Sequence, residues 1–221
     1  MKNYQNLTLL GTSHIAKQSL LEVKKFILEE KPEIITLELD RGRLYGLLNK
    51  RKLKLNDIKD IGIRGFVLNL IGAYVEKKLG KLVGVNPGSE MKLAFKLAKE
   101  NKIQIFLIDQ EISITLKKLI KKFTLKEIFR FMADLFKGFI LRKNDIEPFD
   151  LRKVPEEELI IKVIEKVKER YPSIYEVLIK ERNEYMAKAL YKIMDDNKDK
   201  KILSIMGAGH EKGVYEILTR I

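Results

Sequence analysis

Short apolar runs bounded by turn residues alternate along this chain with longer stretches that have the periodicity of helices. This alternation is typical of a parallel β-sheet, because its strands are buried on both faces and therefore lack polar residues at alternate positions. We expect an α/β fold, with a mainly parallel sheet flanked by helices. The runs that predict its strands are 7–10, 34–39, 82–85, 103–108 and 202–206.

Helical patterns follow three of these runs at the spacing of ordinary strand-helix units. Another pattern, largely helical but interrupted by three glycines, lies between the second and third runs and follows a basic run. The patterns of ordinary length cover 16–30, 90–101 and 211–221, and the interrupted one covers 57–79.

The stretch from 113 to 200 is helical in pattern and separates the last two predicted strands. It is much longer than a crossover between strands requires. We therefore predict an α/β core of residues 1–112 and 201–221, with residues 113–200 as a helical insertion. Several phenylalanines make this insertion apolar enough to need a partner surface, so we expect a cap or an oligomerisation arm, and a homodimer.

Composition restricts the function further. The 221 residues include no cysteine, which excludes disulfides, thiolate metal sites and a cysteine nucleophile. The formal net charge of +13 attracts polyanions, but no nucleic-acid-binding module accompanies the basic runs at 50–54 and 117–122, so we expect no specific nucleic acid partner. No segment has the pattern of a membrane span or a signal peptide, which predicts a cytoplasmic protein for the sequence as written.

The only two histidines occupy matched positions. Each stands three residues after a glycine, in Gly-Thr-Ser-His at 11–14 and Gly-Ala-Gly-His at 207–210, just beyond a predicted strand. Parallel strands bring their carboxyl ends to one edge of the sheet, where ligands bind, so we expect His14 and His210 to share a site. Either histidine alone is more simply a core or capping residue, and it is the matched pair that favours a function.

Glu38 lies between two leucines at the end of the second apolar run. Burying a carboxylate is costly unless it is paired or bound to a cation. Two neutral imidazoles and a carboxylate form a common catalytic metal set with one position open for water. The sequence thus indicates that His14, Glu38 and His210 hold a divalent transition metal, namely Zn, Mn or Co. A salt bridge between Glu38 and an arginine is an equally good explanation.

Arg182 is the arginine that we expect near Glu38, because it falls on an apolar helical stripe with Leu178 and Met186. A guanidinium that faces a core must find an anion. That anion is either Glu38, a substrate carboxylate or a developing oxyanion. The preceding Glu181 is a candidate acid or base, although a solvated helix face explains a single glutamate more simply.

Three further residues near predicted strand ends are candidates for substrate binding: Glu90, Asp109 and Arg41. Ser89 predicts a helix N-cap and Glu90 an acidic first turn, which accounts for both without a function. Glu90 stays a candidate because its turn opens on the same edge of the sheet, and Asp109 just past the fourth run has the same status.

These motifs together cover nearly the whole chain in a fixed order. They are Gly-Thr-Ser-His at 11–14, Leu-Glu-Leu-Asp-Arg at 37–41, Pro-Gly-Ser-Glu-Met at 87–91, Leu-Ile-Asp at 107–109, Glu-Arg-Asn-x-x-Met-Ala at 181–187 and Gly-Ala-Gly-His at 207–210. The set resembles the TraB/PrgY pheromone-shutdown family. By this resemblance the chain is similar to a wider group that holds the Tiki metalloproteases, the erythromycin esterases and the haem-binding ChaN-like proteins.

The resemblance implies a metal-dependent hydrolase, a peptidase that acts on short peptides. Tiki-like members rely on two Gly-x-x-His motifs, which correspond here to His14 and His210. The acidic and Glu-Arg motifs of the family correspond to Glu38, Glu181 and Arg182. The alternative is a non-catalytic protein that sequesters a peptide or another small ligand at the same site.

Many TraB-like proteins continue into C-terminal hydrophobic segments that anchor them in a membrane. The resemblance therefore implies membrane association if the natural protein continues past Ile221. A third interpretation is a basic scaffold whose helices meet acidic membrane headgroups.

Overall fold

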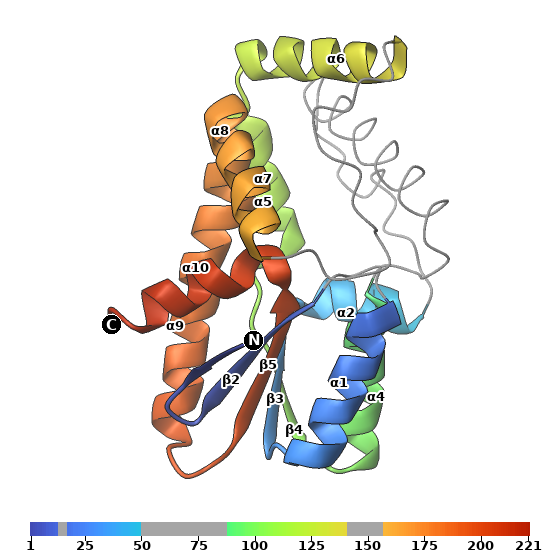
Figure 1. Ribbon diagram of the computed structural model, residues 1–221, viewed down its shortest axis with the longest axis vertical. Helices are drawn as coiled ribbons and strands as arrows, with labels where there is room; N and C mark the ends of the chain where they lie inside the picture. The colour runs from blue at the N-terminus through green and yellow to red at the C-terminus, as the bar shows by residue number, and fades with distance from the viewer. Residues whose placement is uncertain (13–16, 50–87, 141–156) are drawn as a thin grey trace.

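The computed structural model of this chain describes residues 1–12, 17–49, 88–140 and 157–221, which form an α/β fold (Figure 1). The strands are β1 (Lys2–Tyr4), β2 (Leu7–Thr12), β3 (Ile34–Leu37), β4 (Gln104–Leu107) and β5 (Ile202–Gly207). The helices are α1 (Lys17–Glu30), α2 (Arg41–Leu48), α4 (Ser89–Glu100), α5 (Ile112–Lys122), α6 (Leu125–Ile140), α7 (Glu157–Arg170), α8 (Pro172–Tyr175), the π-helix η2 (Glu176–Lys180), α9 (Glu181–Asp196) and α10 (Ala208–Leu218).

The strands form one sheet in the order β1-β2-β5-β3-β4, in which only β1 is antiparallel to its neighbour. The last strand of the chain lies in the middle, where Ile202 is in register with Leu7 on one side and with Ile34 on the other. The parallel strands therefore present their carboxyl ends at one edge, as the sequence predicts. The expected α/β fold with a mainly parallel sheet is confirmed.

Four of the five predicted strands are found, as β2, β3, β4 and β5, with ends shifted by a few residues. The fifth, at 82–85, lies outside the described residues, as do the interrupted helical pattern at 57–79 and His14. The sequence pattern does not reveal β1, because it is only three residues long and mostly polar. It joins the sheet through a tight turn at Gln5, whose φ is 52°.

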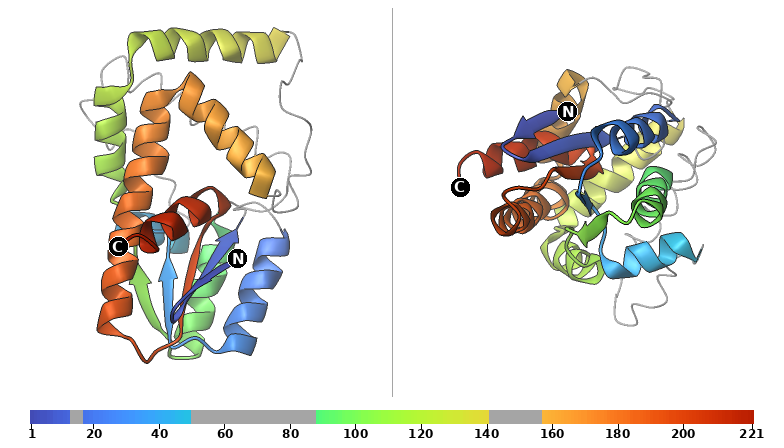
Figure 2. Two further views of the ribbon diagram at one scale, coloured as in Figure 1. Left: turned by 60° about the vertical axis from the view of Figure 1, so that its left-hand side comes forward. Right: turned by 90° about the horizontal axis from the view of Figure 1, so that it is seen from below.

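The two faces of the sheet are covered by different helices (Figure 2). Side chains alternate between the faces along each strand. Ile34 and Ile202 pack against Met186 and Leu190 of α9 and against α10, whereas the next residues along the strands pack against α1 and α4. Helix α9 thus packs directly on the sheet although it belongs to the predicted insertion, and the division into core and insertion stays a prediction.

Helices α5 to α8 lie beyond the carboxyl edge of the sheet, with α6 at the far end of the molecule (Figures 1 and 2). The phenylalanines of this segment have different environments. Phe123 is fully buried within it, whereas Phe129 on α6 is 73% exposed. The predicted homodimer stays a prediction. No helix within the described ranges is long and apolar enough to cross a membrane.

Two helix starts differ from the predictions. Gly88, with a left-handed φ of 81°, is the N-cap of α4, and Ser89 is its first residue. The prediction that Ser89 caps this helix is therefore wrong, because the chain enters the helix through the conformation that glycine favours. Helix α10 begins at Ala208, directly after β5, so His210 lies in the first turn of a helix and not in the turn that precedes it.

Candidate functional site

A buried cluster of charged side chains lies at the carboxyl edge of the sheet. Glu38 follows β3, Asp109 follows β4, His210 lies in the first turn of α10, and Arg182 lies in the first turn of α9. The exposed fractions of Glu38, Asp109 and His210 are only 5%, 5% and 6%. The structure thus brings together four of the predicted site residues.

The Glu38 carboxylate joins the sheet to α9. Its Oε2 accepts a hydrogen bond of 2.6 Å from the backbone N–H of Gly207, and its Oε1 accepts one from Nη2 of Arg182. The predicted salt bridge between Glu38 and Arg182 is therefore confirmed. This bridge supplies the charge partner that a buried carboxylate needs.

Arg182 also binds Asp109 through two hydrogen bonds. Its Nε lies 3.1 Å from Oδ1 of Asp109, and its Nη2 lies 2.5 Å from Oδ2. Burial alone lowers the pKa of Arg182, but the hydrogen bond to Asp109 and the charge of Glu38 outweigh it and raise that pKa. Burial likewise raises the pKa of Asp109, but its two arginine partners outweigh it and lower that pKa. Both groups are therefore charged at neutral pH.

Asp109 has a second arginine partner that the sequence analysis does not single out. Arg43 in the first turn of α2 donates to Asp109 and also to Asp40, whose Oδ2 lies 2.6 Å from Nε of Arg43. Asp40 is the N-cap of this helix and accepts the N–H of Arg43. The predicted substrate-binding residue, Arg41, is instead exposed at the start of α2. An Asp-x-x-Arg pair after a strand is the sequence signal for this arrangement.

His210 is oriented by Asn183 of α9. Nδ1 of His210 lies 2.6 Å from Oδ1 of Asn183, while its Nε2 lies 3.0 Å from Nη1 of Arg182 and 3.4 Å from Oε1 of Glu38. An amide oxygen only accepts hydrogen bonds, so Nδ1 carries the proton. Nε2 of His210 thus lies between the guanidinium group of Arg182, which donates hydrogen bonds, and the carboxylate of Glu38, which accepts them.

Asn183 is a second residue that sequence reasoning does not single out. It approaches α10 closely because residue 213 is glycine, where a Cβ atom would lie 2.2 Å from Nδ2 of Asn183. The signal in the sequence is the asparagine next to Arg182, with a glycine one turn after His210.

Of the remaining predicted residues, Glu181 has partners on α5, Glu90 belongs to α4, and His14 is outside the described residues. Glu181 forms ion pairs with Lys118 at 2.7 Å and Lys122 at 2.6 Å on α5. Burial raises the pKa of Glu181, but these two lysines outweigh it and lower that pKa. Glu90 is buried in the first turn of α4. Since His14 is outside the described residues, the sharing of one site by the two histidines stays a prediction.

Two described donor atoms fit a metal site. Oε1 of Glu38 and Nε2 of His210 are 3.4 Å apart, close to the spacing of two tetrahedral ligands that each lie about 2.0–2.1 Å from zinc. The hydrogen bond from His210 to Asn183 is of the kind that orients metal-bound histidines. Within the described part of the chain, no group of three or more His, Cys, Asp or Glu side chains is arranged to hold a metal ion.

The fold and the residues at the carboxyl edge of the sheet define an α/β protein with a buried Glu–Arg–His cluster beyond its strands. The chain belongs to the TraB/PrgY/gumN family, because a sequence model of this family matches residues 2–221. The resemblance found in the motifs is thus confirmed over nearly the whole chain.

Several curated proteins are similar to this chain. It is 36% identical over 99% of its length to "Uncharacterized protein MJ1365" of Methanocaldococcus jannaschii, and covers 55% of that protein. It is 22% identical to the "TraB domain-containing protein" of Bos taurus and 21% identical to that of Homo sapiens, over 93% of this chain and 60% of each relative. The chain thus spans between half and two thirds of the length of these relatives.

Proposed function

We propose that this protein is a metal-dependent hydrolase, a peptidase that inactivates short peptides in the manner of pheromone shutdown. The observation that carries the proposal is the pair of donor atoms on Glu38 and His210, which lie 3.4 Å apart at the ligand-binding edge of the sheet. His14, Glu38 and His210 would hold a Zn, Mn or Co ion. Such an ion, when bound, lowers the pKa of a water ligand and polarises a carbonyl group.

Arg182 has the geometry to stabilise an oxyanion. Asp109 fixes the plane of its guanidinium group through two hydrogen bonds, which directs Nη1 and Nη2 toward His210 and Glu38. A fixed cation in a buried site stabilises developing negative charge more strongly than one in water. In this proposal Glu38 is a metal ligand or the general base, and Arg182 stabilises the transition state.

The second candidate function is non-catalytic capture of a peptide or small ligand. The observation that favours it is the position of Arg182, whose guanidinium group contacts both donor atoms that a metal would need. An arginine that stays in this position excludes a metal ion and leaves a binding site without a Lewis acid.

Peptide cleavage by the whole chain separates the two functions. The chain is incubated with a defined mixture of short peptides and with Zn, Mn or Co in turn, and products are identified by mass spectrometry. We expect cleavage by the wild type and by Glu184→Gln, a control on the exposed face of α9, and none by His210→Ala or Glu38→Gln. Cleavage that persists in both site variants would contradict the proposal. Peptide that is bound but never cleaved by the wild type would also contradict it, in favour of capture.

A further inference from the structure

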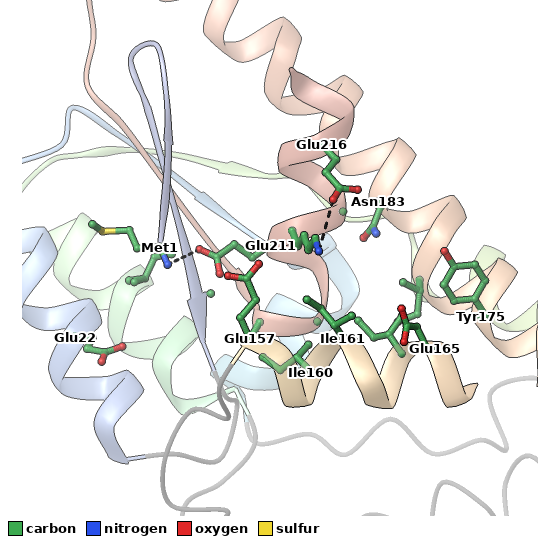
Figure 3. Close-up of a pocket in the computed structure, with 18 of the residues that line it drawn as sticks. Met1, Glu22, Glu157, Ile160, Ile161, Glu165, Tyr175, Asn183, Glu211 and Glu216 are labelled. Atoms are coloured by element: carbon green, nitrogen blue, oxygen red, sulfur yellow. Dashed lines mark ion pairs between the residues drawn. The ribbon is translucent and has the colours of Figure 1, made fainter. Parts of the chain in front are cut away.

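A cavity of about 700 Å³ lies beside the candidate site, between α1, α7 and α10 (Figure 3). Its described lining includes Asn183, which orients His210, and Gly209, which belongs to the motif of that histidine. Among the described residues, no atom beyond the neighbouring backbone of α10 lies within 4 Å of the place where a Cβ at Gly209 would be. A ligand in this cavity would therefore lie next to the buried cluster.

The walls of the cavity combine apolar and acidic character. Ile160, Ile161 and Ile164 of α7 form an apolar wall. Five glutamates and three lysines are among the other lining residues, and with the α-ammonium group of Met1 the formal charges leave an excess of one negative charge. This combination suits a ligand that has apolar side chains and a positive group.

Glu211 already binds an amine inside this cavity. Its Oε1 lies 2.8 Å from the α-ammonium group of Met1, and Figure 3 shows the two groups pointing toward each other. Glycine at position 11 makes room for the carboxylate, since a Cβ there would lie 2.5 Å from Oε2 of Glu211. The Glu211 side chain is only 14% exposed, so its charge is poorly solvated and favours a cationic partner.

We propose that this cavity binds the amino-terminal end of an apolar peptide, with the free α-amine on Glu211 and the first side chains against Ile160, Ile161 and Ile164. The ammonium group of Met1 makes the same contact and is displaced by the peptide. The proposal rests on the proposed function for its choice of a peptide, and it specifies that function by requiring a free amino end. His210 and Glu211 are consecutive residues that face the cluster and the cavity respectively, so the bound end lies beside the site.

Binding of one peptide in two forms tests this proposal without any cleavage. The probe is the pentapeptide Leu-Ile-Ala-Val-Phe with a fluorophore at its carboxyl end, prepared with a free and with an acetylated amino end. Fluorescence anisotropy is measured on the whole chain in EDTA, which removes divalent metals. We expect the free form to bind at least about tenfold more tightly, because it forms a charge-assisted hydrogen bond in a partly buried site.

Three variants locate this preference. Glu211→Gln should reduce it to less than about twofold, because the amide has no charge to pair with an ammonium group. Gly11→Ala should also reduce it, because the added Cβ displaces the Glu211 carboxylate. Glu158→Gln, an exposed residue of α7 that does not line the cavity, should retain it. Thermal unfolding of each variant shows that it is folded.

Equal affinity of the wild type for both peptides would overturn the proposal, and so would a preference that survives in Glu211→Gln. The outcome is distinct from that of the proposed function, because it is measured without metal and without turnover. A preference for the free amine without any cleavage would support this inference and contradict the proposed hydrolase. Cleavage of peptides irrespective of their amino end would contradict only this inference.

Discussion

Arg182 is the residue on which the charged cluster depends, because it contacts Glu38, Asp109 and His210 at once. Its side chain is 14% exposed, so water screens these contacts little. Removing one partner of a buried ion pair leaves the other charges without compensation, which costs much more than the net stabilisation of the pair.

We therefore predict that Arg182→Gln lowers the free energy of unfolding by about 3–5 kcal/mol at pH 7. The pKa of Asp109 is lowered in the folded protein, so its pairing stabilises the fold above pH about 4 and this stabilisation is lost as the pH falls further. The difference in the free energy of unfolding between the wild type and Arg182→Gln should therefore become smaller over the same pH range. Denaturant unfolding at pH 7 and pH 3.5 measures it, with the exposed Arg220→Gln as control. A difference that is constant with pH would contradict this account of Asp109.

Two glycines of α10 differ in the space around them, which gives a matched pair of variants. Gly213→Ala places a methyl group 2.2 Å from Nδ2 of Asn183, whereas Gly209→Ala meets no described atom within 4 Å beyond the neighbouring backbone of α10. We predict that Gly213→Ala lowers the melting temperature, because Asn183 must leave His210 or α9 must shift. Gly209→Ala should leave it unchanged or raise it, since alanine favours helices over glycine by about 0.5–1 kcal/mol. Thermal unfolding of both variants checks this, and equal losses would show that Asn183 has room to move.

Among the elements, α6 is attached to its neighbours at its start and again through Asp134, which binds Arg170 and Tyr171. Thr124 and Glu127 form a capping box, in which the side chain of each accepts the backbone N–H of the other. Glu127 also accepts the N–H of Ser173 at 2.8 Å, which ties α6 to α8. Burial raises the pKa of Glu127, but these hydrogen bonds outweigh it and lower that pKa.

We predict that Glu127→Ala loosens α6 selectively, with a local cost of about 1–2 kcal/mol. Amide hydrogen exchange should accelerate in 125–134 and 172–175, whereas β5 at the centre of the sheet keeps its protection. The neighbouring Lys126→Ala is the control, because Lys126 is exposed. Unchanged exchange in α6 would mean that other contacts hold this helix.

The elements also show how far the sequence predicts this structure. Apolar runs identify β2 to β5, because the central strands β3 and β5 are buried on both faces and the edge strand β4 still has three apolar residues of its four. The partner of Glu38 is predictable because Arg182 interrupts an apolar stripe and must meet an anion. Arg43 and Asn183 are not predictable in this way, because each becomes part of the site through a residue distant in the sequence, Asp109 and His210 respectively. Polar contacts between distant elements do not produce a periodic pattern in the sequence.

At the scale of the whole molecule, α6 presents an apolar stripe of Leu125, Phe129 and Met132, which are 60%, 73% and 46% exposed. Residues four and three apart lie on one face of a helix. If this stripe forms the predicted homodimer, Phe129→Ser should raise the dissociation constant by about tenfold or more, because a large buried aromatic side chain contributes about 2 kcal/mol. Sedimentation equilibrium tests this with Lys126→Ser as control. A monomeric wild type at all concentrations would exclude the dimer.

The proposed hydrolase depends on a divalent metal at the carboxyl edge of the sheet. Metal content is therefore the most direct measurement, by elemental analysis of untagged protein after equilibrium dialysis against Zn, Mn or Co. We predict close to one ion per chain for the wild type and for Arg220→Gln, and loss of that ion in the His14→Ala/His210→Ala double variant, while unfolding stays cooperative. A wild type that takes up none of the three metals, or a double variant that keeps its ion, would contradict the central claim.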